Sequence, residues 1–211
     1  MPSTPALSPF PHARFSARDR REDHLDQLLF AGTDFTAAHA EGVGFLECVL
    51  EGVVLDEAHL SGSRWAECRW ERVRGISVSL VEASLIETAW EGCRLAAVSA
   101  WGSTWRDVTV RGGKIDFLNL RGARLKDVRF EDCVITELDL QEATVDGLTF
   151  DGCTLALPEF GRGRYTRLDL SGATLRGPRG LAGLKGAILG RAQVIELAEE
   201  LASELGIVVT D

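Results

Sequence analysis

The amino-acid sequence predicts a solenoid, a single elongated domain wound from short repeats and closed at its C-terminal end by a helical cap. Three observations predict this fold class. Large apolar residues recur at every fifth position from Phe30 to Leu175, and the phase does not slip. A second register, two positions earlier, holds mostly small residues from Val43 onward. An amphipathic segment follows where the five-residue phase ends. A fixed short period over a long stretch is typical of solenoids.

The five-residue period matches neither a strand, which repeats every 2 residues, nor a helix, which repeats about every 3.6. Only Ala40, Gly75 and Ala100 interrupt the large residues, and we expect a thinner core at Gly75 and Ala100. Glycine is frequent two positions after each large residue. Because glycine adopts backbone conformations that other residues resist, this placement indicates a tight turn in every repeat.

Three segments carry a more specific pattern: LDLSGATLRG at 168–177, LNLRGARLKD at 118–127 and LDLQEATVDG at 138–147. They resemble the pentapeptide-repeat family, and the resemblance covers about 150 residues of the 211 at the repeat spacing expected of a solenoid. It implies an all-β solenoid, a right-handed quadrilateral β-helix in which four pentapeptides form one coil. Residues 20 apart then stack, so Trp70 is predicted to lie over Trp90, while Leu85 separates Trp65 from Trp105.

We divide the chain into three regions. Residues 1–24 contain four of the six prolines and several arginines, which is typical of a flexible tail. This tail is either a disordered leader or a basic arm that touches a partner. Residues 25–179 form the pentapeptide-repeat β-helix, and residues 180–211 form a C-terminal capping helix and dimerisation segment.

The C-terminal region predicts a cap because the open end of a solenoid must be covered. Residues 191–206 have the apolar stripe of an amphipathic helix, and Ile207, Val208 and Val209 follow as a short apolar strand. The segment either caps the rod alone or also forms a homodimer. The dimer is favoured because the apolar residues exceed what one end needs, and the resemblance implies it too. The residues expected at this cap or dimer surface are Val194, Leu197, Leu201, Leu205, Ile207 and Val209.

The five cysteines all occupy the small register, which predicts that they pack as small apolar side chains: Cys48, Cys68, Cys93, Cys133 and Cys153. Their odd number and the lack of a CxxC pair argue against a disulfide framework or a zinc site, and favour a reducing compartment. His39 and His59 lie 20 apart and should stack. Two stacked imidazoles can bind a metal ion, but the spacing fixes no third ligand, so we predict no cofactor and no metal.

The sequence also excludes several classes of function. It contains no GxSxG, HExxH or GxxxxGK[ST] motif and no histidine beyond His59, so an enzyme is not expected. A net charge of −9 argues against direct binding of nucleic acid, which needs basic patches. The sequence shows neither a transmembrane run nor a signal peptide, which predicts a cytoplasmic protein that is not attached to a membrane.

Acidic residues form two columns at the 20-residue spacing, on either side of one face of the predicted rod. We call the two columns the acidic strip: Glu47, Glu51, Glu67, Glu71, Glu87, Glu91, Asp107, Asp127, Glu131 and Asp151. These ten carboxylates, against Arg69, Arg111 and Arg129 on the same face, give the strip a net charge of −7. Stacked like charges destabilise a sheet. The strip is therefore either a solvated face whose repulsion is tolerated or a binding surface.

The family resemblance gives this surface a function. Members of similar architecture bind DNA gyrase and topoisomerase IV by mimicking DNA, with a charged rod about as wide as the duplex. They inhibit the enzyme or confer resistance to topoisomerase poisons. The resemblance thus implies a protein partner, DNA gyrase or topoisomerase IV. The alternative is a non-enzymatic structural or regulatory scaffold that binds another protein through the same faces.

Overall fold

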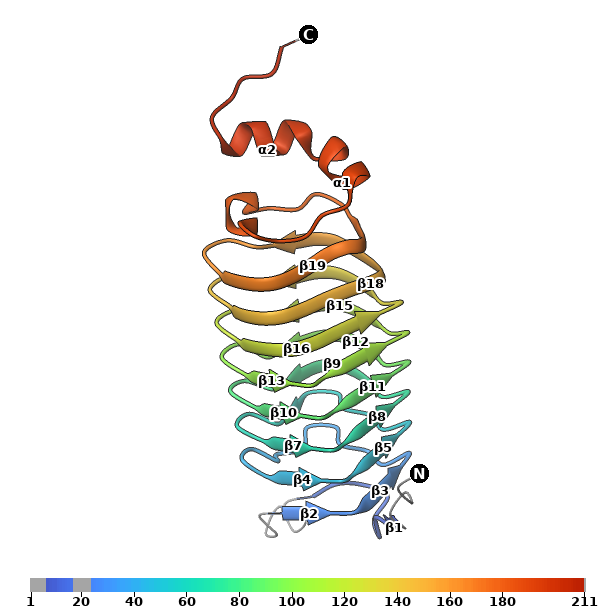
Figure 1. Cartoon of the computed structure of the whole chain (residues 1–211). Helices are drawn as coiled ribbons and strands as arrows, with labels where there is room; N and C mark the ends of the chain where they lie inside the picture. Colours follow the sequence, from blue (N-terminus) through green and yellow to red (C-terminus); the bar gives the residue numbers. More distant parts are fainter. Residues whose placement is uncertain (1–6, 17–23, 211) are drawn as a thin grey trace, which may run out of the picture.

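The protein is a parallel β-solenoid of about eight turns, as a computed structural model that describes residues 7–16 and 24–210 shows (Figure 1). The coils stack into one rod, with the first coils at the N-terminal end and short helices at the other end. The predicted fold class is confirmed. Among the described residues, no helix is both long and apolar enough to cross a membrane.

In the described part of the chain, nineteen strands belong to one sheet that winds around the rod. The strands of the first coils are β1 (Ser8–Pro9), β2 (His24–Asp26), β3 (Leu28–Ala31), β4 (Gly44–Leu46), β5 (Val49–Glu51), β6 (Ala58–His59), β7 (Arg64–Ala66), β8 (Arg69–Glu71), β9 (Arg74–Ser79) and β10 (Ser84–Ile86). The later strands are β11 (Ala89–Glu91), β12 (Arg94–Ser99), β13 (Thr104–Arg106), β14 (Thr109–Arg111), β15 (Lys114–Asn119), β16 (Arg124–Glu131), β17 (Val134–Asp139), β18 (Thr144–Glu159) and β19 (Arg164–Leu175).

Strands pair in parallel with the strand one coil away, and the register is 20 residues, apart from a shift within the β18–β19 pair, where Asp151 lies opposite Gly172. Leu85 in β10, for example, lies between Trp65 in β7 and Trp105 in β13. Large side chains at every fifth position point inward and are buried, and the small register between them is buried too. Inward residues of successive coils therefore form continuous stacks, which explains why one residue in five must be large.

The aromatic residues of the core stack as the sequence predicts. The rings of Trp70 and Trp90 are parallel within 6°, and their centroids lie 4.6 Å apart. Val110 follows in the same stack, paired with Trp90. The indole Nε1 of Trp65 donates a hydrogen bond to Ser63 Oγ. The Nε1 atoms of Trp70, Trp90 and Trp105 are buried and have no acceptor within the described part of the chain.

The turn glycines adopt the left-handed backbone conformation that their spacing predicts. Gly32, Gly52, Gly92 and Gly112, for example, have φ angles between 59° and 62°. The same conformation occurs at non-glycine residues in equivalent positions, among them Glu67 with a φ of 55°. Every coil thus turns with a residue at positive φ, whether or not that residue is glycine.

We expected a thinner core at Gly75, but the structure shows none. A Cβ atom at this position would lie 2.7 Å from Val78 Cγ2 and 3.2 Å from Leu55 Cβ. Neighbouring side chains therefore fill the space that a large residue occupies in other coils.

The five cysteines are free and buried, and burial raises the pKa of the Cys93 thiol to about 12. Both results agree with a closely packed interior.

Residues 7–16, which lie in the expected flexible tail, are paired with the first full coil. Ser8 and Pro9 are in register with Leu28 and Leu29. The Phe10 ring lies 4.5 Å from the Phe30 ring, and buried Phe15 stacks on Phe35 at the same distance. Two phenylalanines continue the five-residue phase, so they can be buried where a proline- and arginine-rich tail would remain solvated. Residues 1–6 and 17–23 of that tail lie outside the described residues.

The C-terminal segment forms a 3-10 helix, η2 (Leu181–Leu184), and two short helices, α1 (Arg191–Glu196) and α2 (Ala198–Glu204). The single helix predicted for residues 191–206 is broken at Leu197, a buried residue with non-helical ψ of 11°. Buried Gln193 donates hydrogen bonds to the carbonyl oxygens of Leu170 and Ala173, which attaches α1 to the last coil. The strand predicted at residues 207–209 is absent, because these residues pair with no described strand.

Candidate functional site

The structure brings the two columns of the acidic strip together on one side of the rod. The first column lies at the corner between β4 and β5 and at the equivalent corners of later coils. The second column ends β5, β8 and β11, where Glu71 is in register with both Glu51 and Glu91. Arg111 interrupts this column and is in register with Glu91 and Glu131, as the sequence indicates. The strip is thus one continuous surface.

Arginines neutralise about half of the strip, and they include residues from outside its own face. Arg72 lies 2.6 Å from Glu51, and Arg111 lies 2.6 Å from Glu131. Arg167 reaches Asp127 across two coils at 3.1 Å. Longer contacts, of 3.8 and 3.9 Å, hold Glu71 near Arg69 and Asp107 near Arg106. Because Arg72, Arg106 and Arg167 come from neighbouring columns, the counting of charges on a single face missed them.

The remaining acids concentrate in the N-terminal half of the strip. Together with Glu71, whose contact with Arg69 is 3.8 Å long, four of them form a surface that we call the acidic patch: Glu47, Glu67, Glu71, Glu87 and Glu91. Glu67, Glu87 and Glu91 are exposed, and none of the three forms an ion pair within the described ranges. Glu47 accepts a hydrogen bond from the amide of Gln27, which leaves its charge uncompensated. Asp151 is exposed at the far end of the strip, apart from this patch.

The corner residues of the acidic strip have a backbone conformation that glycine adopts more readily. Glu47, Glu67, Glu87, Asp107 and Asp127 all have φ between 51° and 55°. A left-handed conformation costs a non-glycine residue roughly 1–2 kcal/mol. The next corner of the same coils carries mostly glycine. Carboxylates thus occupy five consecutive corners at which glycine would be more stable, a feature that sequence alone does not reveal because it requires the φ angles.

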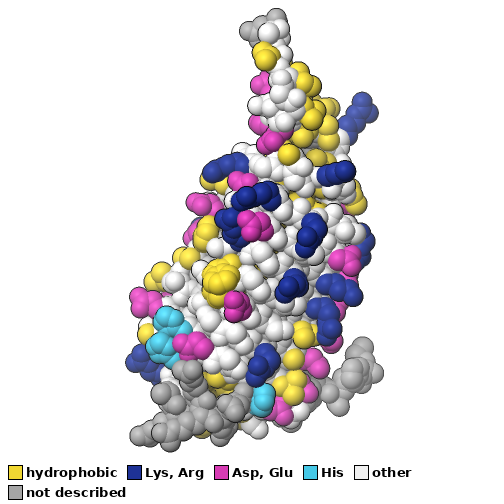
Figure 2. Space-filling model, turned by 90° about the vertical axis from the view of Figure 1, so that its left-hand side faces the viewer, with side chains coloured by type: hydrophobic (Ala, Val, Ile, Leu, Met, Phe, Trp, Pro, Cys, Tyr) yellow, Lys and Arg dark blue, Asp and Glu magenta, His cyan; other side chains and the backbone are white. Residues whose placement is uncertain are grey.

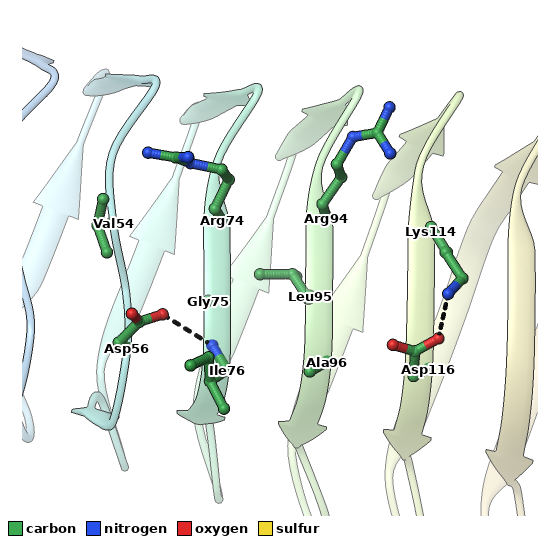
Figure 3. A pocket seen from close by; sticks show the side chains of 10 residues that line it. All are labelled: Val54, Asp56, Arg74, Gly75, Ile76, Arg94, Leu95, Ala96, Lys114 and Asp116. Atoms are coloured by element: carbon green, nitrogen blue, oxygen red, sulfur yellow. Dashed lines mark hydrogen bonds and ion pairs between the residues drawn. The ribbon is translucent and has the colours of Figure 1, made fainter.

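A surface hollow of about 450 Å³ lies outside Gly75 and was not predicted. Figure 3 shows Arg74 and Arg94 along one edge and Asp56 and Asp116 along the other. Lys114 forms an ion pair of 2.7 Å with Asp116. The lining residues include no histidine, cysteine, serine or threonine. Three basic residues at the 20-residue spacing beside a core glycine were the signal that could have revealed it.

His39 and His59 stack as predicted, with ring centroids 4.5 Å apart and planes within 5°. Figure 2 shows histidine side chains beside acidic ones near the N-terminal end of the rod. This cluster lies on a different face of the coil from the acidic strip, because His39 and His59 precede the core residues Ala40 and Leu60.

The residues predicted for the cap and dimer separate into two groups. Leu197 is buried and Leu201 is half-buried, so both belong to the cap. Val194, Leu205, Ile207 and Val209 are exposed, and Leu205 reaches 77%. Hydrophobic side chains gather at this end of the molecule (Figure 2). Four of the six predicted residues therefore present apolar surface to solvent.

Comparisons with known proteins give limited information. No family model matches the chain, and no curated protein matches it. Among solved structures, QnrB1, a plasmid-mediated fluoroquinolone resistance protein, is 21% identical, with a TM-score of 0.32, over 89% of this chain and 96% of that chain. HetL, a pentapeptide-repeat protein involved in heterocyst differentiation regulation from the cyanobacterium Nostoc sp. strain PCC 7120, is 15% identical, with a TM-score of 0.26, over 79% of this chain and 91% of that chain.

These similarities are too low to assign a function, and the assignment of the fold rests on the chain itself. Its large residues keep a five-residue phase, all of them point inward, and its strands pair in parallel at a register of 20 residues. Four five-residue repeats therefore complete each coil, and this chain is a parallel β-solenoid of five-residue repeats.

Proposed function

We propose that this protein is a non-catalytic binding rod whose acidic patch mimics the phosphates of DNA and binds a type II topoisomerase, DNA gyrase or topoisomerase IV. The observation that carries the proposal is the row of carboxylates at corners where glycine would be more stable. Among the described residues, fourteen non-glycine residues have positive φ, and five of them are the consecutive carboxylates of this one column, Glu67 and Glu87 included. The family resemblance supplies the class of partner and implies resistance to topoisomerase poisons.

The charge density of the acidic patch supports this mimicry. Parallel strands lie roughly 4.8 Å apart, and the two columns supply two carboxylates per coil, for example Glu67 and Glu71. The patch has five carboxylates over three coils, so it carries about one charge per 2.9 Å of axis at that strand spacing. DNA carries one charge per roughly 3.4 Å along each strand and one per roughly 1.7 Å for both strands. A basic groove that binds the duplex would meet a similar charge density on this rod.

The proposal is tested by titrating the protein into a gyrase supercoiling assay. We expect the wild type to inhibit supercoiling, and the variant with Glu67→Lys, Glu71→Lys, Glu87→Lys and Glu91→Lys to lose inhibition, because its patch repels a basic groove. The matched control makes the same change in charge on exposed cap residues, with Glu196→Lys, Glu199→Lys, Glu200→Lys and Glu204→Lys. Circular dichroism establishes that both variants are folded.

Three results separate the possibilities. Inhibition by the wild type and by the cap variant, but not by the patch variant, supports the proposed surface. Equal loss in both variants contradicts the location of the site and indicates an effect of net charge. If the wild type has no effect at tens of micromolar, a range in which an ordinary specific complex would form, the gyrase proposal fails for the enzyme tested.

The alternative function is a scaffold for another protein, which the sequence led us to expect on the same faces as the acidic strip. Exposed apolar residues favour other faces of the rod for it. Trp101 is 46% exposed on the outside of the rod, and Ile76 is exposed beside the hollow at Gly75. Tryptophan is enriched among residues that dominate binding energy at protein interfaces. The same assay discriminates the two functions, because a scaffold leaves supercoiling unchanged. A scaffold would then retain its partner in the patch variant and lose it in Trp101→Ala.

We also propose that the C-terminal segment forms a homodimer through Leu205, Ile207 and Val209. Light scattering coupled to gel filtration should give twice the chain mass of 23.0 kDa for the wild type. The variant with aspartate at these three positions should give 23.0 kDa, because buried charges oppose association. Leu46→Asp, at an exposed position on the solenoid, is the control and should remain dimeric. A monomeric wild type contradicts the proposal.

A further inference from the structure

The histidine pair acquires in the structure the third partner that the sequence did not supply. His39 and His59 belong to neighbouring coils and pair in parallel register. Glu41 follows His39 at the turn, where Gly42 has a φ of 73°. Its side chain returns toward the histidine, so His39 Nδ1 and Glu41 Oε1 lie 2.9 Å apart. One possible ligand atom from each of the three residues lies within 4.8 Å of the other two.

We propose that His39, His59 and Glu41 bind a divalent transition-metal ion of the zinc class. Two imidazoles and one carboxylate are ligands that zinc accepts, and imidazole also suits copper and nickel. Three protein ligands leave one tetrahedral position for water or an external group. The proposal does not depend on the acidic patch or on binding to a topoisomerase.

The geometry requires only rotation of side chains. Zinc–ligand distances near 2.0–2.1 Å place the ligand atoms of a tetrahedral site about 3.4 Å apart. Ligand atoms as far as 4.8 Å apart must therefore approach by about 1.4 Å, and the His39 and Glu41 atoms, 2.9 Å apart, must separate by about 0.5 Å. Exposed side chains can achieve such shifts by rotating about their side-chain dihedral angles. The side chain of His39 is 60% exposed, and His59 is exposed as well. The two rings have to leave their parallel stack so that one nitrogen of each points to a common centre.

The surroundings suit a bound ion. The contact between His39 Nδ1 and Glu41 Oε1 already holds two of the three ligand atoms side by side. Ser79 is in register with His59, and its hydroxyl lies 2.8 Å from the hydroxyl of Ser61. Hydroxyl groups beside the ligands can hold a metal-bound water by hydrogen bonding. The ion would also connect two successive coils near the N-terminal end of the rod.

The test is isothermal titration of the full, untagged chain with zinc chloride at neutral pH. We expect one zinc ion per chain and a rise in melting temperature with zinc, because a ligand that binds only the folded state stabilises it. His59→Asn and Glu41→Gln should each weaken binding at least tenfold and reduce the thermal shift. His24→Asn, at an exposed position on β2, is the matched control and should bind as the wild type does.

The outcomes decide between this site and its alternatives. Affinity unchanged in His59→Asn overturns the proposal, as does the absence of any heat or thermal shift with the wild type. A stoichiometry of one zinc per two chains also overturns it, because the ion would then lie between molecules. Loss of binding in both ligand variants, with circular dichroism and melting temperature unchanged in the absence of zinc, supports the site.

Discussion

Replacing Trp90 with alanine is expected to lower the free energy of unfolding by about 3–5 kcal/mol, the usual loss for a buried large aromatic residue. Trp90 is fully buried, stacks on Trp70 and packs against Trp105 at a centroid distance of 5.3 Å. Truncation opens a cavity shared by neighbouring coils. A solenoid cannot repair such a cavity from elsewhere, because each coil contacts only its neighbours.

Two control variants separate packing from the polar group of the indole. Trp90→Phe keeps a ring in the stack and removes an Nε1–H that has no acceptor in the described part of the chain. A buried unsatisfied donor costs about 1–3 kcal/mol, so this variant should lose less than about 1.5 kcal/mol, as hydrophobic swaps usually do. Trp101→Ala, at an exposed position, should change stability by about 0.5 kcal/mol or less.

Urea unfolding at equilibrium measures these differences when the variants share one slope. If Trp90→Phe is as unstable as Trp90→Ala, then the hydrogen bond rather than packing dominates, and a partner of Nε1 must exist. If Trp101→Ala is as unstable as Trp90→Ala, then the assignment of Trp101 to the outside of the rod is wrong.

The sequence predicted the core of this fold because one simple rule governs it. Every coil repeats the same inward positions, so the phase that begins at Phe30 identifies buried residues up to Leu175, and the 20-residue register identifies their neighbours. The rule failed at the ends. Phe10 and Phe15 obey it, but the surrounding prolines and arginines concealed it. Beyond the last coil the phase stops, and the break at Leu197 depends on contacts with the solenoid, which periodicity does not report.

The candidate site was predicted only in part, because the net charge of the acidic strip depends on arginines from several columns. The acidic columns are where the sequence placed them. The arginines that neutralise Glu51 and Asp127 approach from adjacent corners and from two coils away, and spacing along one face does not reveal them. The same limit applied to His39 and His59, whose third partner, Glu41, is brought close by a turn. The 20-residue spacing along the sequence identified each column. Only the three-dimensional structure showed which side chains are in contact.

Replacing both Glu67 and Glu87 with glycine is expected to make the protein more stable and less active. Both residues have positive φ, 55° and 52°. Glycine removes a strain of roughly 1–2 kcal/mol per residue. Its greater conformational freedom in the unfolded chain cancels about 0.5–1 kcal/mol of that stabilisation. The double variant should therefore gain about 1–2 kcal/mol in the free energy of unfolding, and it should inhibit gyrase less because two charges of the patch are lost.

The control variant carries Glu67→Ala and Glu87→Ala. Alanine removes the same charges but keeps a Cβ atom at positive φ, so it should lose inhibition without the gain in stability. Urea unfolding and the supercoiling assay are applied to both double variants. Together they separate the cost in stability of a side chain at positive φ from the effect of the carboxylate charge on inhibition. If the glycine variant is more stable and inhibits as well as the wild type, these carboxylates are tolerated rather than used. If stability rises while inhibition falls in step with the alanine variant, the chain retains strained glutamates because its partner requires their charge.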